Sequence, residues 1–166
     1  MIPENLQANP EVAALSGIVT AAKFEFGELT IEVAPEAILT ALGRVKRELK
    51  YERLTSVTGV DRYPAEPRFE VVYHLQSIAN KSRLRLKARL PGTNPQIESA
   101  VTVYRGADWY ERETFDLFGV VFLNHPDPRR IMMPDDWEGH PLRKDYDPHH
   151  QDDEWVRKNL GIESGR

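Results

Sequence analysis

Three closely spaced carboxylates are the first residues of this sequence that could do chemistry. Glu111, Glu113 and Asp116 lie within about one and a half turns of a predicted helix, where two of them could act as acid and base. Arg112 stands beside them and can form an ion pair with Asp116, four residues further on. An ion-pair network is the more economical interpretation, so the cluster predicts structure or contact rather than catalysis.

Histidines and aspartates near the C-terminus are a second candidate, because imidazole and carboxylate groups bind borderline metals. Adjacent histidines point apart on most backbones, however, and the chain has no HExxH-type pair on a helix. A solvated tail is the simpler interpretation, and a metal-dependent enzyme is kept as an alternative. Its ligands would be His149, His150, Asp152 and Asp153, with His125 and His140 as further members.

The composition excludes other kinds of chemistry. The 166 residues include no cysteine, so the chain forms no disulfide and supplies no thiolate to an iron–sulfur cluster. The ten glycines are scattered, without a phosphate-binding loop, and no motif for nucleophilic catalysis is present. The net charge of −4 argues against nucleic-acid binding. We expect a chain without a cofactor or a bound metal.

The sequence also lacks the patterns of export and membrane insertion. No apolar run approaches the ~20 residues that a membrane-spanning helix needs. The first fifteen residues show neither a basic-then-apolar signal nor an arginine-rich transit pattern. We therefore expect a cytoplasmic bacterial protein.

A row of cations follows one predicted strand, because Arg83, Arg85, Lys87 and Arg89 alternate with apolar residues. Most such rows are solvated strand faces. An acidic partner surface would explain the row equally directly, whereas nucleic acid is disfavoured because no aromatic residues interleave with the cations. A stand-alone binding module for an anionic partner is the second alternative.

The elements that position these groups form an α+β domain. We predict a single mixed sheet covered by helices on one face, followed by a long irregular C-terminal arm. Residues 1–16 are a lead-in, residues 17–122 form the domain, and residues 123–166 form the proline-rich arm and tail.

Periodicity places the elements within the domain. Alternation predicts one hairpin with strands at 21–26 and 29–33, a strand at 54–60, and a second hairpin with strands at 69–77 and 82–90. The first hairpin would turn at Gly27-Glu28 and pair residue 26 with 29 and 24 with 31, which puts Phe24, Phe26, Leu29, Ile31 and Val33 on one face. Helical spacing predicts helices at 35–49, 96–104 and 108–119, the last running from an N-cap at Asp108 to Gly119.

Two residues do not fit the pattern of helix 108–119. Glu111 falls between Phe115 and Phe118 on the apolar side, and Trp109 stands among charged residues. A carboxylate on an apolar face must find a partner or lose several kcal/mol in desolvation. We expect Glu111 to be at least partly buried and held by an arginine, and another segment or another protein to cover Trp109.

The arm combines prolines with apolar side chains. Prolines at 126, 128, 134 and 141 prevent long helices and central strands. A simple linker would carry polar residues where this arm has Ile131, Met132, Met133, Trp137, Leu142 and Tyr146. We expect the arm to become ordered on a partner; the alternative is that it folds back over its own domain.

The segment from Glu111 to Met132 resembles the signature of a known family, the thirty-kilodalton subunit of respiratory complex I, which in bacteria is the NADH-quinone oxidoreductase. The matching residues are Glu111-Arg112-Glu113, Asp116-Leu117-Phe118, His125, Arg129 and Ile131-Met132. The stretches LTSVTGVDRYP at 54–64 and GHPLRKDYD at 139–147 are also similar to that family. The resemblance covers roughly residues 54–147.

This resemblance implies a cofactor-free docking subunit in the hydrophilic arm of a proton-pumping NADH:quinone oxidoreductase. Its partner would be the forty-nine-kilodalton subunit at the quinone site, while NADH, FMN, iron–sulfur clusters and quinone would belong to other subunits. The complex would place the chain on the cytoplasmic side of the bacterial membrane, as a peripheral component.

No residue is expected to be catalytic. The predicted partner-binding residues lie on the signature helix and along the arm: Trp109, Glu111, Arg112, Glu113, Asp116, Phe118, His125, Arg129, Arg130, Met132, Trp137, Arg143, Asp145 and Tyr146.

Overall fold

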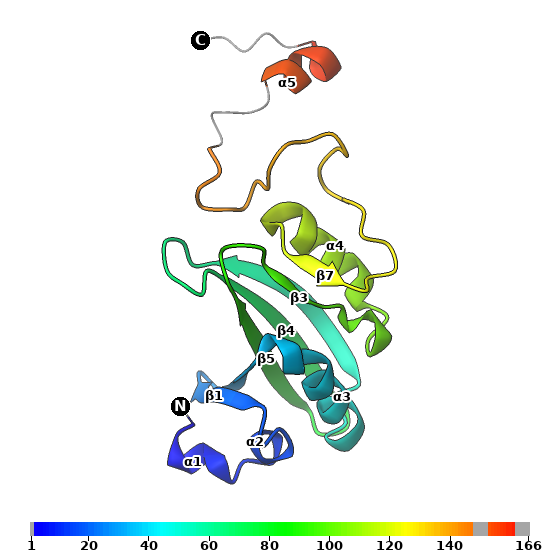
Figure 1. Ribbon diagram of the computed structural model, residues 1–166. Coiled ribbons are helices and arrows are strands. Elements are labelled where there is room, and N and C mark those ends of the chain that lie inside the picture. Colours follow the sequence, from blue (N-terminus) through cyan, green and yellow to red (C-terminus); the bar gives the residue numbers. More distant parts are fainter. Residues whose placement is uncertain (1, 148–152, 162–166) are drawn as a thin grey trace.

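A five-stranded mixed sheet supports the other elements of the chain (Figure 1). The computed structural model describes residues 2–147 and 153–161. β2 and β5 pair in parallel, whereas the other neighbouring strands are antiparallel. The strands follow the order β1 (Val19–Glu25), β2 (Glu28–Val33), β5 (Ser82–Leu90), β4 (Phe69–Ser77) and β3 (Arg53–Asp61). The predicted α+β fold with a mixed sheet is confirmed.

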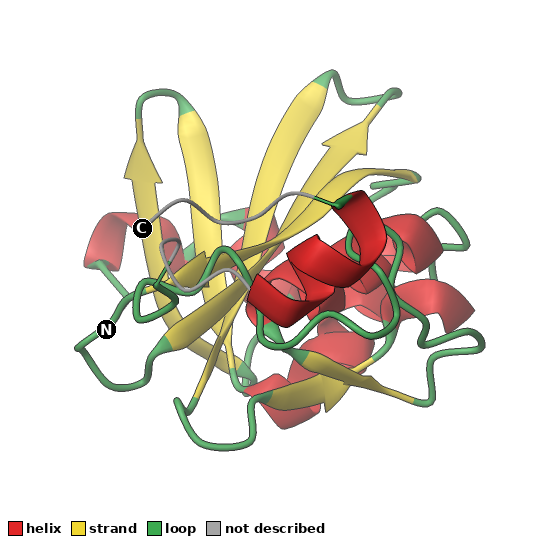
Figure 2. Ribbon diagram, turned by 90° about the horizontal axis from the view of Figure 1, so that it is seen from above, coloured by secondary structure: helices red, strands yellow, loops and turns green. Residues whose placement is uncertain are grey.

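Short helices and a small second sheet complete the architecture. β6 (Gln96–Glu98) and β7 (Val121–Leu123) form a parallel pair. Figure 1 places α5 at the end of the molecule beyond the arm, and Figure 2 shows the molecule from that end. The helical elements are α1 (Glu4–Gln7), α2 (Pro10–Ala14), η1 (Pro35–Ala37), α3 (Ile38–Glu48), η2 (Ala100–Thr102), α4 (Ala107–Phe118) and α5 (Asp153–Leu160).

The core lies on the sheet face that α3 and α4 cover. The β4–β5 hairpin has the predicted strands, with Tyr73 opposite Leu86 and Leu75 opposite Leu84, and all four side chains are buried. α3 adds Ile38, Ala41, Leu42 and Val45 to the same cluster, which confirms its predicted apolar stripe. The alternation of apolar and polar residues along β4 and β5 thus decides which face packs inward.

α4 approaches the sheet closely because β3 has a glycine beneath it. A Cβ atom at Gly59 would lie 2.7 Å from Cδ2 of Phe118 and 3.1 Å from Cγ2 of Thr114. Both of these side chains belong to α4, so Gly59 sets how close the helix comes to β3. This approach fixes the place of every functional side chain on α4.

The first hairpin differs from its predicted register. Phe24 pairs with Leu29 and Glu25 pairs with Glu28, so the turn consists of Phe26 and Gly27. Both have positive φ angles, 54° and 77°, as a type I′ turn requires. Phe24 lies on the same face as Leu29, as predicted, although it is 58% exposed at the end of the hairpin. The predicted place of Phe26 on that face is wrong, because Phe26 is fully exposed in the turn.

The predicted helix at 96–104 is also wrong. Residues 96–98 form β6, which pairs with β7, and only the short η2 turn follows. The backbone N–H of Val121 donates to Pro95 O and that of Ser99 donates to Leu123 O, at 2.9 Å each. A strand more than twenty residues away thus satisfies this backbone, which local periodicity does not reveal. α4 likewise begins one residue before its predicted N-cap, Asp108, and ends at Gly119 as predicted, with φ of 72°.

Among residues 2–147 and 153–161, no helix is long and apolar enough to cross a membrane.

We predict that Gly59→Ala destabilises the fold by about 1–3 kcal/mol, because the added methyl group forces Phe118 and Thr114 of α4 away from the sheet. Urea denaturation measures the change in the free energy of unfolding. Gly43→Ala in α3 is the control, since its Cβ would meet only the movable, exposed Arg47 guanidinium and alanine favours the helix by about 0.5–1 kcal/mol. Equal effects of the two substitutions would contradict this account of the helix–sheet contact.

Candidate docking site

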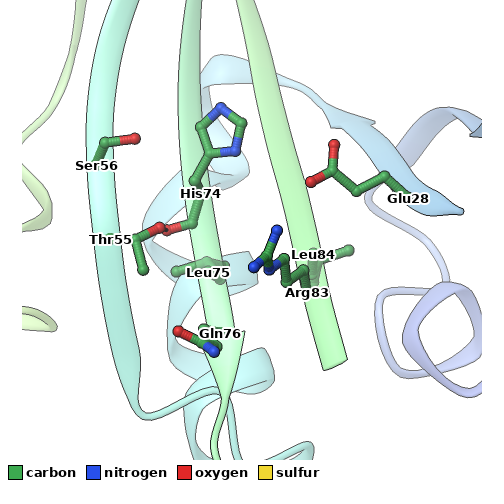
Figure 3. A pocket seen from close by; sticks show the side chains of 8 residues that line it. All are labelled: Glu28, Thr55, Ser56, His74, Leu75, Gln76, Arg83 and Leu84. Atoms are coloured by element: carbon green, nitrogen blue, oxygen red, sulfur yellow. Dashed lines mark hydrogen bonds between the residues drawn. The ribbon is translucent and has the colours of Figure 1, made fainter. Parts of the chain in front are cut away.

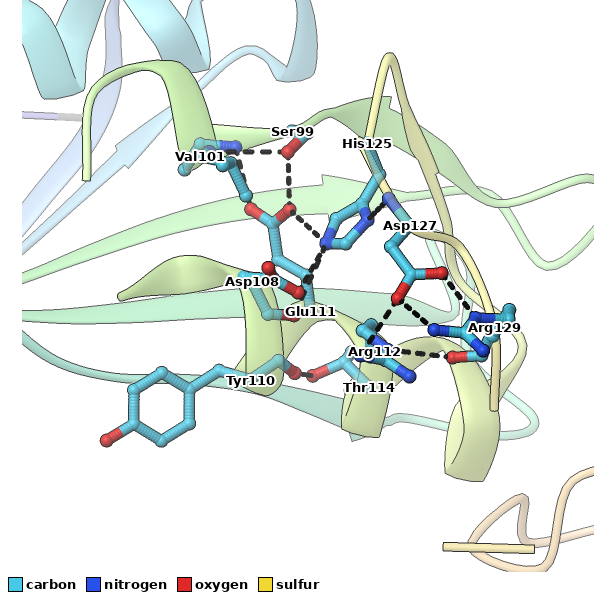
Figure 4. Close-up of polar contacts among 11 residues, drawn as sticks. Ser99, Val101, Asp108, Tyr110, Glu111, Arg112, Thr114, His125, Asp127 and Arg129 are labelled. Carbon is cyan, nitrogen blue, oxygen red and sulfur yellow. Dashed lines mark hydrogen bonds and ion pairs between the residues drawn. The ribbon is translucent and has the colours of Figure 1, made fainter. Parts of the chain in front are cut away.

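Glu111 is fully buried on α4 and binds the start of η2 (Figure 4). One carboxylate oxygen accepts a hydrogen bond from Ser99 Oγ at 2.6 Å, and the other accepts one from the backbone N–H of Ala100 at 2.7 Å. The predicted burial is confirmed, but the predicted arginine partner is wrong. The donors at the start of η2 take that place because β6 brings residues 99 and 100 over the helix.

His125 closes the same cluster from the start of the arm. Its Nδ1 accepts a hydrogen bond from the backbone N–H of Asp127 at 3.0 Å, so the neutral ring carries its proton on Nε2. This Nε2 lies 3.6 Å from Asp108 Oδ1 and 3.8 Å from Glu111 Oε2, and the imidazole is 2% exposed. Burial, aided by the charge of Asp108, raises the pKa of Glu111 to about 7, even though Ser99 and Ala100 donate to it.

Asp116 holds the arm against α4. Its buried Oδ2 accepts hydrogen bonds from three successive backbone N–H groups, those of Ile131 at 3.1 Å, Met132 at 2.7 Å and Met133 at 2.9 Å. Its Oδ1 pairs with Arg130 Nη1 at 2.7 Å. Burial opposes ionisation, but these donors outweigh it and lower the pKa of Asp116. The predicted pair with Arg112 is therefore wrong, because the arm covers this carboxylate.

Arg112 binds the first part of the arm instead. Its Nη1 lies 3.2 Å from Asp127 Oδ2, and its Nε donates to the carbonyl oxygen of Arg129 at 3.0 Å. The guanidinium also lies 5.0 Å from the ring centre of Trp109, in a cation–π contact. Trp109 nevertheless stays 64% exposed, so no segment of the described chain covers it as we expected.

The C-terminal end of α4 is completed by the GHPLRKDYD stretch. Leu142 N–H donates to Leu117 O at 3.0 Å, Arg143 Nε donates to Phe118 O at 2.6 Å, and His140 Nδ1 lies 2.8 Å from Asp116 O. The last carbonyl groups of a helix have no partner within the helix. The arm supplies these partners, so His140 and Arg143 have a structural role here.

Arg68 fastens the end of the arm to the sheet. Its guanidinium forms ion pairs with Asp61 at 2.8 Å and with Asp145 at 2.5 Å, and the backbone N–H of Lys144 donates to Asp61 Oδ2 at 2.9 Å. Sequence reasoning missed Asp61 and Arg68, as it missed Ser99. The signal was present at Asp61, which occupies a core-facing position of β3 where an apolar residue is expected.

The arm thus folds back over its own domain, which was the alternative interpretation, and the expectation that only a partner holds it needs correction. Of the predicted partner-binding residues, Glu111, Asp116, His125, Arg130, Arg143 and Asp145 bind groups of this chain. Phe118 packs over Gly59, and Trp137 lies 5.4 Å from Trp155. The residues Trp109, Glu113, Arg129 and Met132 are exposed, and Tyr146 is half-buried.

Metal binding gains no support from the described chain. Within residues 2–147 and 153–161, no group of three or more histidine, cysteine or acidic side chains could hold a metal ion. His125 and His140 are engaged as described above. His149, His150 and Asp152, proposed as ligands from the sequence, lie outside the described residues, and the side chain of Asp153 is not described.

Comparison with known proteins decides the family. A family model described as "Respiratory-chain NADH dehydrogenase, 30 Kd subunit" matches residues 31–152. The chain belongs to this family. One subunit of the NADH-quinone oxidoreductase of Geobacter sulfurreducens is 53% identical over 121 residues, which cover 72% of this chain and 75% of that protein. The corresponding subunit from Trichlorobacter lovleyi is 46% identical over 144 residues, 86% of either chain.

Two solved structures share the fold of this chain. A trypsin-resistant fragment of Nqo5 matches with a TM-score of 0.59 and 28% identity, covering 64% of this chain and 87% of the fragment. A chain of the membrane-bound sulfane sulfur reductase, an archaeal respiratory membrane complex, matches with a TM-score of 0.73 and 26% identity. That match covers 90% of this chain and 88% of the other. The predicted family is confirmed, and the chain is a complex I subunit of the 30-kDa type.

We predict that Glu111→Gln alters the pH dependence of stability. Folding raises the pKa of Glu111 from 4.5 to about 7, so its stabilising contribution is complete below pH ~4.5 and is lost as the pH rises through ~7. The native free energy of unfolding should therefore fall between pH 5 and pH 8, relative to the variant, by roughly 3 kcal/mol. Urea denaturation at the two pH values measures this difference. Glu113→Gln, on the exposed side of the same helix, should leave the pH dependence of the free energy of unfolding unchanged. The same pH dependence in the native chain and in Glu111→Gln would contradict the raised pKa of Glu111.

We predict that Asp116→Ala frees the arm while the sheet stays folded. The substitution leaves three backbone N–H groups and Arg130 without their acceptor, which costs about 3 kcal/mol or more. Amide hydrogen exchange at residues 131–133 should accelerate at least about a hundredfold, with β4 unchanged. Glu113→Ala is the matched control. If these amides already exchange freely in the native subunit, Asp116 does not hold the arm and ordering by a partner is the better account.

Proposed function

We propose that this chain is a structural docking subunit in the hydrophilic arm of a proton-pumping NADH:quinone oxidoreductase. It packs against the forty-nine-kilodalton subunit of that complex through α4 and the outer side of the arm, and it carries no cofactor. The main support is the arrangement of side chains in the signature segment. The carboxylates of Glu111 and Asp116 are bound by groups of this chain, whereas the large apolar side chains of Trp109 and Met132 are exposed to solvent.

The burial and internal hydrogen bonding of the Glu111 and Asp116 carboxylates argue against catalysis. Glu111 binds the start of η2 and Asp116 binds the arm, so both carboxylates already have a structural role. The chain also has no cysteine to hold an iron–sulfur cluster. These observations support a role in assembly.

The exposed residues have the character of a protein interface. Trp109 is 64% exposed, Met132 is 62% exposed and Leu142 is 52% exposed. Tryptophan and methionine are enriched in interfaces relative to the rest of protein surfaces, and tryptophan is enriched among the residues that dominate binding energy. Arg112 holds the Trp109 ring on one side, which leaves the other side for a partner.

The similar structures support the same conclusion. The bacterial relatives described above are subunits of NADH-quinone oxidoreductases, whereas one solved neighbour belongs to a sulfane sulfur reductase. A fold that occurs in complexes with different electron chemistry is well suited to a role independent of the electron donor. Within a membrane-bound complex this chain would be a peripheral component on the cytoplasmic side.

The two alternative functions have weaker support. A metal-dependent enzyme would rest on C-terminal residues, and no described cluster adds to them. A stand-alone module for anionic partners would rest on the cations of β5, of which Arg85, Lys87 and Arg89 already form ion pairs within the sheet.

We expect Trp109→Ala and Met132→Glu to weaken assembly at least about tenfold, because each removes or charges an exposed apolar anchor. The measurement is the amount of the forty-nine-kilodalton subunit that copurifies with the tagged chain. Phe26→Asn is the matched control, since Phe26 is even more exposed but lies in the β1–β2 turn, where Asn-Gly is favoured. Undiminished copurification with both variants, or an equal loss with the control, would overturn the docking surface.

A further inference from the structure

The sheet face opposite α3 and α4, called the open face below, is rich in charge. In a chain with a net charge of −4, this face carries three more cations than carboxylates. The cations are Lys23, Arg53, Arg62, Arg83, Arg85, Lys87 and Arg89. The carboxylates are Glu25, Glu28, Glu32 and Glu70.

Most of these cations are neutralised by neighbouring strands. Glu70, which is 1% exposed, lies 3.1 Å from both Arg62 and Lys87 and 3.6 Å from Arg89. Arg89 also pairs with Glu32 at 2.9 Å. Arg85 pairs with Glu28 of β2, whereas Lys23 pairs with Glu25 on its own strand. The row of cations along β5 is therefore largely an internal ion-pair ladder.

Arg83 is one of two exceptions. It is exposed at the start of β5 and, like Arg53 at the start of β3, forms no ion pair with any residue of the described chain. It borders a hollow of about 340 Å³ on the open face, shown in Figure 3. The hollow is lined by Glu28, Thr55, Ser56, His74, Leu75, Gln76, Arg83 and Leu84.

The hollow offers several donors around a single free positive charge. The guanidinium of Arg83, the amide of Gln76 and the hydroxyl of Ser56 make no hydrogen bond elsewhere in the described chain, and all three line the hollow. Burial and the charges of Arg85 and Lys87 lower the pKa of His74, so its ring is a neutral hydrogen-bonding group at pH 7. The carboxylate of Glu28 also lines the hollow, but Arg85 balances its charge.

We propose that this hollow binds one carboxylate side chain, Asp or Glu, of a neighbouring polypeptide, with Arg83 as its principal partner. A guanidinium matches a carboxylate with two parallel hydrogen bonds. One free cation suits a singly charged carboxylate better than a doubly charged phosphate. Nucleic acid fits poorly, because none of the residues that line the hollow is a Phe, Tyr or Trp on which a base could stack.

This contact is separate from the docking surface on α4, because the two lie on opposite sides of the sheet. It rests on the proposed function only in requiring that the chain be part of a multisubunit complex. The neighbour on the open face would therefore be a second contact within that complex.

Carbodiimide cross-linking of the purified complex carrying Arg83→Lys tests this proposal. The reagent joins an amine to an adjacent carboxylate, and the substitution keeps the positive charge while supplying the amine. We expect mass spectrometry to find an amide bond between position 83 and an Asp or Glu of another subunit. The Lys23–Glu25 pair, 2.8 Å apart on the same face with both side chains 55% exposed, must cross-link in the same sample and shows that the reagent reaches this face.

A second variant measures the strength of the contact. Arg83→Gln should increase the dissociation of this chain from the complex roughly tenfold or more, as expected for losing a charge-assisted pair. Lys81→Gln, in the adjacent β4–β5 turn, is the matched control and should have little effect.

Several outcomes would overturn the proposal. One is an intact complex in which Lys23–Glu25 cross-links but position 83 does not. Others are a cross-link from position 83 only to Glu28 of the same chain, or only to a lipid headgroup. Each of these leaves the proposed docking function in place. If the native chain copurifies with no partner at all, the docking function itself fails, and this proposal fails with it.

Discussion

One buried carboxylate, that of Asp116, connects the two halves of this structure. Three successive backbone N–H groups and the Arg130 guanidinium converge on it. A buried carboxylate with fewer donors would carry a large desolvation cost, and a proline-rich arm without this acceptor would have unsatisfied N–H groups. The arm supplies the donors that the carboxylate requires, and the carboxylate supplies the acceptor that the arm requires. The arm therefore takes a defined path without secondary structure of its own.

The end of α4 depends on the same arrangement. A helix leaves its last carbonyl groups unpaired, and the arm returns at residues 140–143 with donors for three of them. Arg68 then ties the following residues to Asp61 on β3. Because Gly59 lets α4 lie directly on β3, the sheet, the helix and the arm form three layers held by buried polar contacts as well as by the apolar core.

The pairing of these buried carboxylates with donors of the same chain bears on function. The signature residues that look reactive, Glu111 and Asp116, are occupied by structural bonds, while Trp109 and Met132 remain on the outside. On the opposite side of the sheet, the ion-pair ladder leaves Arg83, at the edge of the hollow, without a carboxylate among the described residues. The chain therefore resembles an adaptor with different chemistry on its two sides.

The sequence by itself determined the features that depend on neighbours along the chain: the strands of the β4–β5 hairpin, the apolar stripe of α3, the end of α4 at Gly119 and the burial of Glu111. Its motif spacing also indicated the family. Only the tertiary structure decided which donors meet Glu111 and Asp116, that residues 96–98 pair with β7, and that the arm closes on its own domain. The type I′ turn at Phe26-Gly27 likewise followed from register, not from the glycine alone. Periodicity is local, whereas a buried carboxylate binds whichever donor packing brings within about 3 Å, and those donors come from distant parts of the chain.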